Sequence, residues 1–141
     1  MKKFSFNFLT IACAGVLALV GWVLLLVTNG VAGFAVDNGG LAIGLGLVAA
    51  ALCCAGAFAA EKFGAQNVIT AAVKVCALAL IMVVIGVLIA DRANLASGLF
   101  TWDSHNSVGW TAFSTAVASI VFFLLAVVAH IVSAFQTGKK A

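Results

Sequence analysis

The chain has 141 residues, of which 65% are hydrophobic and 8% are charged, and its mean hydropathy is +1.28. Soluble domains are about 45–50% apolar and about 25% charged, so this composition excludes a soluble globular domain and a disordered chain. The seven lysines and arginines are dispersed and too few for a nucleic-acid-binding surface. We therefore expect an all-α integral membrane protein with a single membrane domain, residues 1–141.

Four apolar stretches are long enough to cross a bilayer, since a spanning helix needs about 20 residues. The spans are predicted at residues 8–28, 41–60, 68–90 and 112–135. The connections between them are predicted as outward loops at 29–40 and 91–111 and a cytoplasmic loop at 61–67. Proline is absent, which favours continuous helices. Short connections favour a four-helix bundle with up-down-up-down topology.

A secretory signal peptide is the alternative interpretation of the first span, because its apolar run follows Lys2 and Lys3. A signal peptide has an apolar core of about 7–15 residues, whereas this run is longer and continues into a glycine-rich turn. We expect a retained membrane helix. Lipid attachment at Cys13 is disfavoured, because the preceding Thr10-Ile11-Ala12 lacks the leucine of a lipoprotein cleavage sequence.

The positive charges predict the orientation, because lysine and arginine are retained in the cytoplasm during insertion. Four spans place both termini on one side, together with the connection at 61–67. That side holds five cations, namely Lys2, Lys3, Lys62, Lys139 and Lys140. The other side holds Arg92 alone. Both termini are therefore expected in the cytoplasm, with Trp22, Trp102 and Trp110 near the outer interface.

Small residues in the second predicted span indicate close helix packing, since helices in lipid associate through close backbone approach and polar contacts. A row at four-residue steps contains Gly46, Ala50 and Cys54. The close-packing motif Gly40-x-x-x-Gly44 lies at the start of the same span. We expect these five residues to pack against neighbouring helices.

Lys74 and His130 are the candidate functional residues. Lys74 is the only charged residue within a predicted span, about 9 Å from its start by helix rise. It is interpreted as a structural lysine that extends to the headgroups, as an anionic-lipid site or as a transport residue. For His130, an interhelical hydrogen bond and a ligand- or proton-handling role are both open. We expect the two residues to lie near one another at the inner end of the bundle.

The four cysteines lie within the predicted spans, at a depth similar to that of His130. They are Cys13, Cys53, Cys54 and Cys76. Buried structural thiols and a soft metal or haem site are the two interpretations. A CxxC pair and a second histidine at that depth are missing, so neither a metal nor a cofactor is expected.

The predicted outward loop at 91–111 contains the candidate partner-binding residues. They are Phe100, Trp102, Asp103, His105 and Trp110. The aromatic side chains are expected to anchor at the lipid headgroups around a solvated turn. Aromatic residues beside polar groups also suit contact with a partner protein or a glycan.

The sequence lacks a phosphate loop, a catalytic triad and a paired-carboxylate site, so an enzyme is not expected. The leading hypothesis is a non-enzymatic accessory or scaffold subunit of a bacterial inner membrane. Such a subunit contacts the lipid bilayer and forms a homo-oligomer or joins a larger membrane complex, without nucleic acid. The alternative is an oligomeric channel or small-solute transporter, with its inner mouth near Lys74 and His130.

Overall fold

The computed structural model describes residues 6–64 and 66–136, and the regular structure of these residues is entirely helical. The helices are α1 (Phe6–Asn29), α2 (Gly39–Phe63), α3 (Val68–Thr101) and α4 (Ser107–Gln136). Each helix is long and apolar enough to cross a membrane. The prediction of an all-helical protein with four helices of membrane-crossing length is confirmed.

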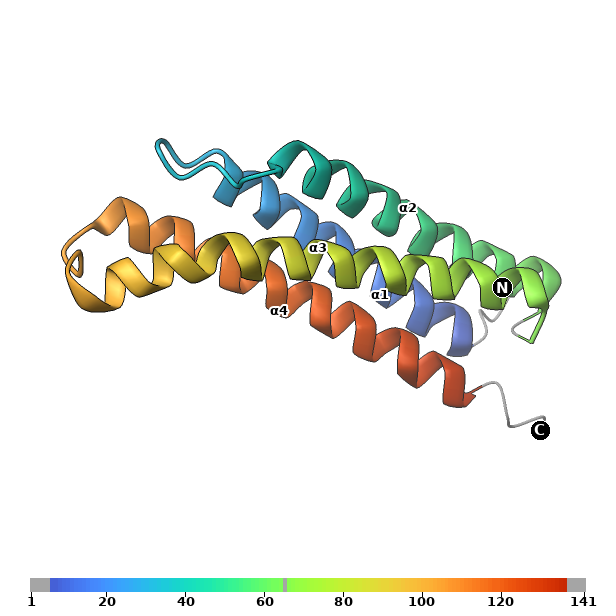
Figure 1. Ribbon diagram of the computed structural model, residues 1–141. Helices are drawn as coiled ribbons and strands as arrows, with labels where there is room; N and C mark the ends of the chain where they lie inside the picture. The colour runs from blue at the N-terminus through green and yellow to red at the C-terminus, as the bar shows by residue number, and fades with distance from the viewer. Residues whose placement is uncertain (1–5, 65, 137–141) are drawn as a thin grey trace.

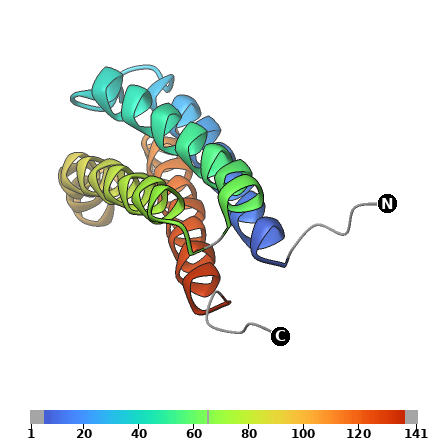
Figure 2. The same cartoon turned by 90° about the vertical axis from the view of Figure 1, so that its right-hand side faces the viewer.

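Successive helices run in opposite directions along a common bundle axis (Figure 1). The start of α1 and the end of α4 meet at one end, where the Thr10 hydroxyl donates to Gln136 Oε1 at 2.9 Å. We call this the terminal end, and we call the opposite end, where α3 connects to α4, the hairpin end. Figure 2 looks along the bundle from the terminal end and shows the helices following one another around a ring. Among neighbouring helices, packing is most extensive between α1 and α4 and least extensive between α3 and α4.

The close approach of α1 and α4 depends on small residues and on two buried hydroxyl groups. Ser119 Oγ donates to the Gly21 carbonyl, and Thr28 Oγ1 donates to the Ala112 carbonyl, both at 2.7 Å. The buried ring of Phe123 covers Gly21, where a Cβ would lie 3.2 Å from the ring. Interhelical hydrogen bonds and small residues are the ordinary means of helix association in lipid.

Alanine is the most frequent residue in the interior, while many larger aliphatic side chains point outward. Ala18, Ala49 and Ala126 belong to the main core cluster and are fully buried. By contrast, Val16 and Val128 are largely exposed on the bundle surface. This distribution suits a protein that contacts lipid, because lipid accepts large apolar side chains and small residues let helices approach.

Asparagine residues precede three of the helices. Asn38 adopts the left-handed conformation (φ 59°) immediately before α2, a conformation that asparagine tolerates better than most residues. The Asn67 side chain accepts a hydrogen bond from the Ile69 amide, and the Asn106 side chain accepts one from the Gly109 amide. These N-terminal caps allow short turns before α3 and α4.

The segment predicted as a long loop at 91–111 is mostly helical, which corrects that prediction. α3 continues to Thr101 and α4 begins at Ser107. Neither glycine nor proline occurs in 91–97, and alanine, arginine and leucine are strong helix formers. The loss of apolar character after Ala90 therefore does not end the helix. Similarly, α2 continues through Phe63, so the predicted loop at 61–67 is shorter than expected.

The length of α3 extends the hairpin end beyond the rest of the bundle. By helix rise α3 is about 51 Å long, whereas the hydrocarbon core of a bilayer is about 30 Å thick. Figure 1 shows that the α3–α4 connection projects past the α1–α2 connection. The fold therefore separates a packed four-helix region from a projecting two-helix tip.

Candidate functional site

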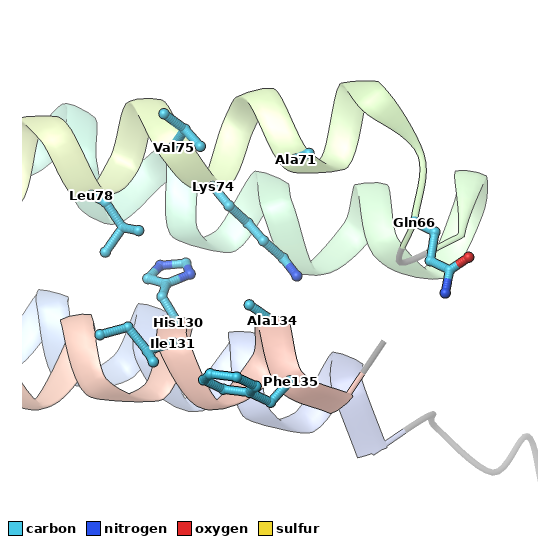
Figure 3. Close-up of a pocket in the computed structure, with 9 residues that line it drawn as sticks. All are labelled: Gln66, Ala71, Lys74, Val75, Leu78, His130, Ile131, Ala134 and Phe135. Atoms are coloured by element: carbon cyan, nitrogen blue, oxygen red, sulfur yellow. The ribbon is translucent and has the colours of Figure 1, made fainter. Parts of the chain in front are cut away.

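Lys74 from α3 and His130 from α4 line the same cavity near the terminal end (Figure 3). The cavity has a volume of about 510 Å³, within the range of small-molecule sites. Apolar side chains form most of its wall, among them Leu78, Ile131 and Phe135. It lies between the two neighbouring helices that pack least extensively. The structure therefore brings the two candidate residues, Lys74 and His130, together in the wall of one cavity.

Lys74 is 9% exposed, and its position on α3 follows from helical periodicity. Thr70, Lys74 and Ala77 lie on the buried face of α3, at the three- and four-residue steps of one helix side. The long side chain extends from this face toward the terminal end (Figure 3). Within residues 6–64 and 66–136, Lys74 forms no ion pair. The cavity is thus lined by a buried cation that no described carboxylate neutralises.

His130 is 2% exposed and is positioned by α2 as well as by its own helix. Its Nε2 lies 3.1 Å from the Cys53 Sγ, a buried hydrogen bond whose direction depends on the tautomer. The Nδ1 atom is also buried and has no hydrogen-bond partner among the described residues. When the thiol donates to Nε2, Nδ1 carries the ring proton and can donate to a group in the cavity.

A second polar cluster lies toward the hairpin end, and its α3 residues, Asp91 and Arg92, were predicted in a loop. Arg92 is 6% exposed. Its Nη2 donates to the Phe34 carbonyl at 2.7 Å and to Thr28 Oγ1 at 3.1 Å. Its Nη1 forms an ion pair with Asp91 Oδ2 at 3.1 Å. The same carboxylate accepts from the Asp37 amide at 2.7 Å through Oδ1.

This cluster corrects the prediction that Asp91 and Arg92 belong to a loop that follows the third helix. Asp91 and Arg92 both lie within α3 and have side chains that are 9% and 7% exposed. The sequence feature that could have predicted their place in a helix is the uninterrupted run of helix-forming residues after Ala90. Their partners on α1 and on the α1–α2 connection depend on how the helices pack, which sequence spacing does not specify.

Three of the aromatic residues near the hairpin end form an edge-to-face cluster. The Phe100 and Trp110 rings lie 5.1 Å apart at an interplanar angle of 88°. Phe113 packs edge-on against both, at 6.0 and 5.9 Å. The indole of Trp110 also donates to the Ser104 carbonyl at 2.9 Å. The cluster stiffens the turn between α3 and α4.

The other candidate residues of the turn face away from the helices. Trp102 is 87% exposed, and Asp103 and His105 are exposed as well. Asp103 Oδ2 accepts a hydrogen bond from the Asn106 side chain at 2.8 Å. The turn therefore presents an indole beside polar groups at the tip of the hairpin.

The small residues of α2 divide into two groups. Gly46 and Ala50 are buried and Cys54 is half-buried, and a Cβ at Gly46 would lie 3.0 Å from Trp22 Cδ1. The motif glycines, Gly40 and Gly44, are exposed, and a Cβ on either would meet nothing within 4 Å. The expectation that these two glycines pack against the other helices of this chain is therefore wrong.

The physical reason is the rotation of α2 about its axis. A two-residue offset turns a helix by about 200°, so burying Gly46 turns Gly44 outward. Trp22 occupies the space that Gly46 leaves, and its indole nitrogen donates to the Ile43 carbonyl at 2.9 Å. Trp22 thus joins α1 to α2.

The cysteines occupy different environments. Cys13 and Cys76 are exposed, Cys53 is buried and Cys54 is half-buried, all as free thiols. In the described part of the chain, no three His, Cys, Asp or Glu side chains gather where they could hold a metal ion. Cys53 is in contact with His130.

Comparison of the chain with protein-family models, with curated proteins and with solved structures finds no match. The four long apolar helices define a small multi-pass membrane protein. A functional assignment beyond this class depends on the Lys74–His130 cavity and the projecting tip.

Proposed function

We propose that this membrane protein is a non-enzymatic accessory or scaffold subunit that binds a partner protein through the projecting tip of the α3–α4 hairpin. The observation that best supports the proposal is the exposure of Phe100 and Trp102, at 68% and 87%, on a helical projection (Figure 1). Aromatic residues are enriched at protein–protein contacts, and exposed apolar patches next to polar groups mark such sites.

The support beneath the tip is rigid. Arg92 joins α3 to the end of α1 through Thr28 and to the α1–α2 connection through Phe34. The aromatic cluster joins the last turn of α3 to the first turns of α4 through Phe100 and Trp110. A surface that is already ordered loses less conformational entropy on binding. The tip is therefore suited to hold a partner in a defined orientation.

The proposal places the protein in a bacterial cytoplasmic membrane, with both termini in the cytoplasm and the hairpin end outside. Lys62 is exposed near the end of α2, at the terminal end. Lysines 2, 3, 139 and 140, on which the charge asymmetry also depends, lie outside the described residues. The hairpin-end cation Arg92 is paired with Asp91. This distribution agrees with retention of positive charge in the cytoplasm.

A channel or small-solute transporter is the second candidate, because Lys74 and His130 line a cavity at the proposed inner end. The two candidates differ in a liposome experiment with the purified full chain. The accessory subunit is expected to leave ion and solute permeability unchanged. Permeability that appears with the wild-type protein and is lost in Lys74→Ala would establish the second candidate and overturn the first.

The accessory role is tested by site-specific photo-crosslinking in the native membrane. A photoreactive residue at Trp102 is expected to give a discrete crosslinked product, either a dimer of this chain or an adduct with another membrane protein. The same residue at Phe63, exposed at the end of α2, is the matched control and is expected to give no such product. Equal products from both positions, or none from Trp102, would contradict the proposal.

A further inference from the structure

The cavity at the terminal end combines two polar groups with an apolar wall, a chemistry that the proposed partner-binding role does not use. The Lys74 side chain and the His130 ring enter the cavity from opposite helices (Figure 3). His130 Nδ1 is buried without a partner among the described residues. None of the described residues that line the cavity is acidic. The site is therefore suited to a ligand that has both an anionic and an apolar part.

The cavity is open to the surface of the bundle that faces lipid. Three side chains of its wall, those of Val75, Ile131 and Phe135, are 64%, 47% and 82% exposed. Such exposed apolar residues on a membrane-crossing helix contact acyl chains. A ligand can therefore enter sideways from the bilayer.

A second cavity of about 230 Å³ lies nearer the hairpin end, with Ile89 of α3 and Val117 and Ile120 of α4 in its wall. Both cavities lie where α3 and α4 pack least extensively. We call the surface that carries these two separate cavities the α3–α4 groove, and its mainly apolar lining suits an acyl chain that runs parallel to the helices.

We propose that the Lys74–His130 cavity binds an anionic phospholipid of the adjacent leaflet. The Lys74 ammonium pairs with the lipid phosphate, His130 Nδ1–H donates a second hydrogen bond to it, and an acyl chain lies along the α3–α4 groove. Cationic pockets between membrane helices bind anionic headgroups in this way. The lysine stem carries its charge toward the terminal end (Figure 3), as long cationic side chains do to reach the headgroup level.

The contact between His130 and Cys53 has a role in this arrangement. Because the thiol can satisfy Nε2, the ring need not turn away from the cavity to find a partner. The Nδ1 proton then has no other partner among the described residues, and because Nδ1 is buried, a small shift of the ring exposes it to a phosphate oxygen. A charge-assisted hydrogen bond inside a low-dielectric region is stronger than one in water.

The test is retention of lipid by the purified full chain, counted by native mass spectrometry after incubation with phosphatidic acid or with phosphatidylcholine. The wild type is expected to prefer phosphatidic acid. Lys74→Gln is expected to weaken that binding about tenfold, because it removes an ionic hydrogen-bond donor. Lys62→Gln is the matched control, since it removes an exposed lysine at the same end of the bundle, and it is expected to bind as the wild type does.

A second variant keeps the proposal testable if Lys74→Gln fails to fold. Ala71 lines the cavity and is exposed, so Ala71→Trp fills the opening without removing the charge, and it is also expected to lose phosphatidic acid. Inorganic phosphate is expected not to displace the lipid. Equal lipid retention by wild type and Ala71→Trp, or by wild type and a folded Lys74→Gln, would overturn the proposal. Complete displacement by inorganic phosphate would also overturn it, because the site would then recognise a free anion.

Discussion

The Arg92 guanidinium donates a hydrogen bond of 2.7 Å to the backbone carbonyl of Phe34, and this contact holds the α1–α2 connection against α3. The same nitrogen also donates to Thr28 Oγ1, whose own hydroxyl proton goes to the Ala112 carbonyl of α4. One buried side chain thereby connects α3 to α1 and, through Thr28, to α4. Polar contacts therefore contribute to holding the hairpin end together, beside the aromatic cluster.

Replacement of Arg92 by leucine is expected to lower the free energy of unfolding by about 3 kcal/mol, because it leaves the Asp91 carboxylate without its ion pair. The stability of Arg92→Lys is expected to lie between those of the wild type and Arg92→Leu, since an ammonium lacks the several N–H donors of a planar guanidinium. Unfolding by sodium dodecyl sulfate in mixed micelles, followed by circular dichroism, measures the free energy of unfolding of both variants. Lys62→Leu, at an exposed position, is the control, and equal losses in Lys62→Leu and Arg92→Leu would contradict the prediction.

Two glycines of α2 that lie close together in sequence are expected to respond in opposite ways to leucine. Gly46→Leu forces a side chain into Trp22, whose Cδ1 would lie 3.0 Å from the new Cβ, and overpacking of this kind costs about 1–3 kcal/mol. Gly44→Leu meets nothing within 4 Å and replaces a poor helix former with a good one, so it is expected to stabilise the protein. The same unfolding assay compares them, and a destabilised Gly44→Leu would show that this face is covered in the assembled protein.

Loss of the Cys53 thiol is expected to destabilise the bundle by about 1 kcal/mol, the usual value of an interhelical hydrogen bond in a membrane. Cys53→Ala leaves His130 Nε2 without the partner that now lies at 3.1 Å, whereas Cys53→Ser restores a donor and is expected to recover part of the loss. Cys76→Ala, at an exposed thiol, serves as control. Identical unfolding curves for Cys53→Ala and Cys76→Ala would show that the contact contributes nothing.

Phe100 in the last turn of α3 and Trp102 immediately after the helix are expected to differ in their effect on stability. Phe100→Ala removes edge-to-face contacts with Trp110 and Phe113, for an expected loss of about 1 kcal/mol. Trp102→Ala changes a side chain that is 87% exposed and is expected to alter stability by less than about 0.5 kcal/mol. A loss of partner binding in Trp102→Ala with unchanged unfolding would therefore reflect the contact itself, whereas reduced stability in this variant would contradict the prediction.

Much of the fold was predictable because a helix in lipid must satisfy its own backbone and present apolar side chains over a known length. The four apolar stretches met that condition, and each became a helix. The helix continues past Ala90, the predicted end of the third span, because polarity marks where apolar character stops and not where backbone hydrogen bonding stops. Asp91 and Arg92 are polar residues within a continuous helix.

The sequence by itself determined the class of protein, since composition and segment length decide whether a chain can be buried in a bilayer. Tertiary structure alone decided which residues meet. Helix rotation buried Gly46 and turned Gly44 outward, and loose packing of α3 against α4 left the cavity that Lys74 and His130 share. Such contacts join residues far apart in the chain, and they depend on the relative rotation and depth of whole helices, which local sequence patterns do not encode.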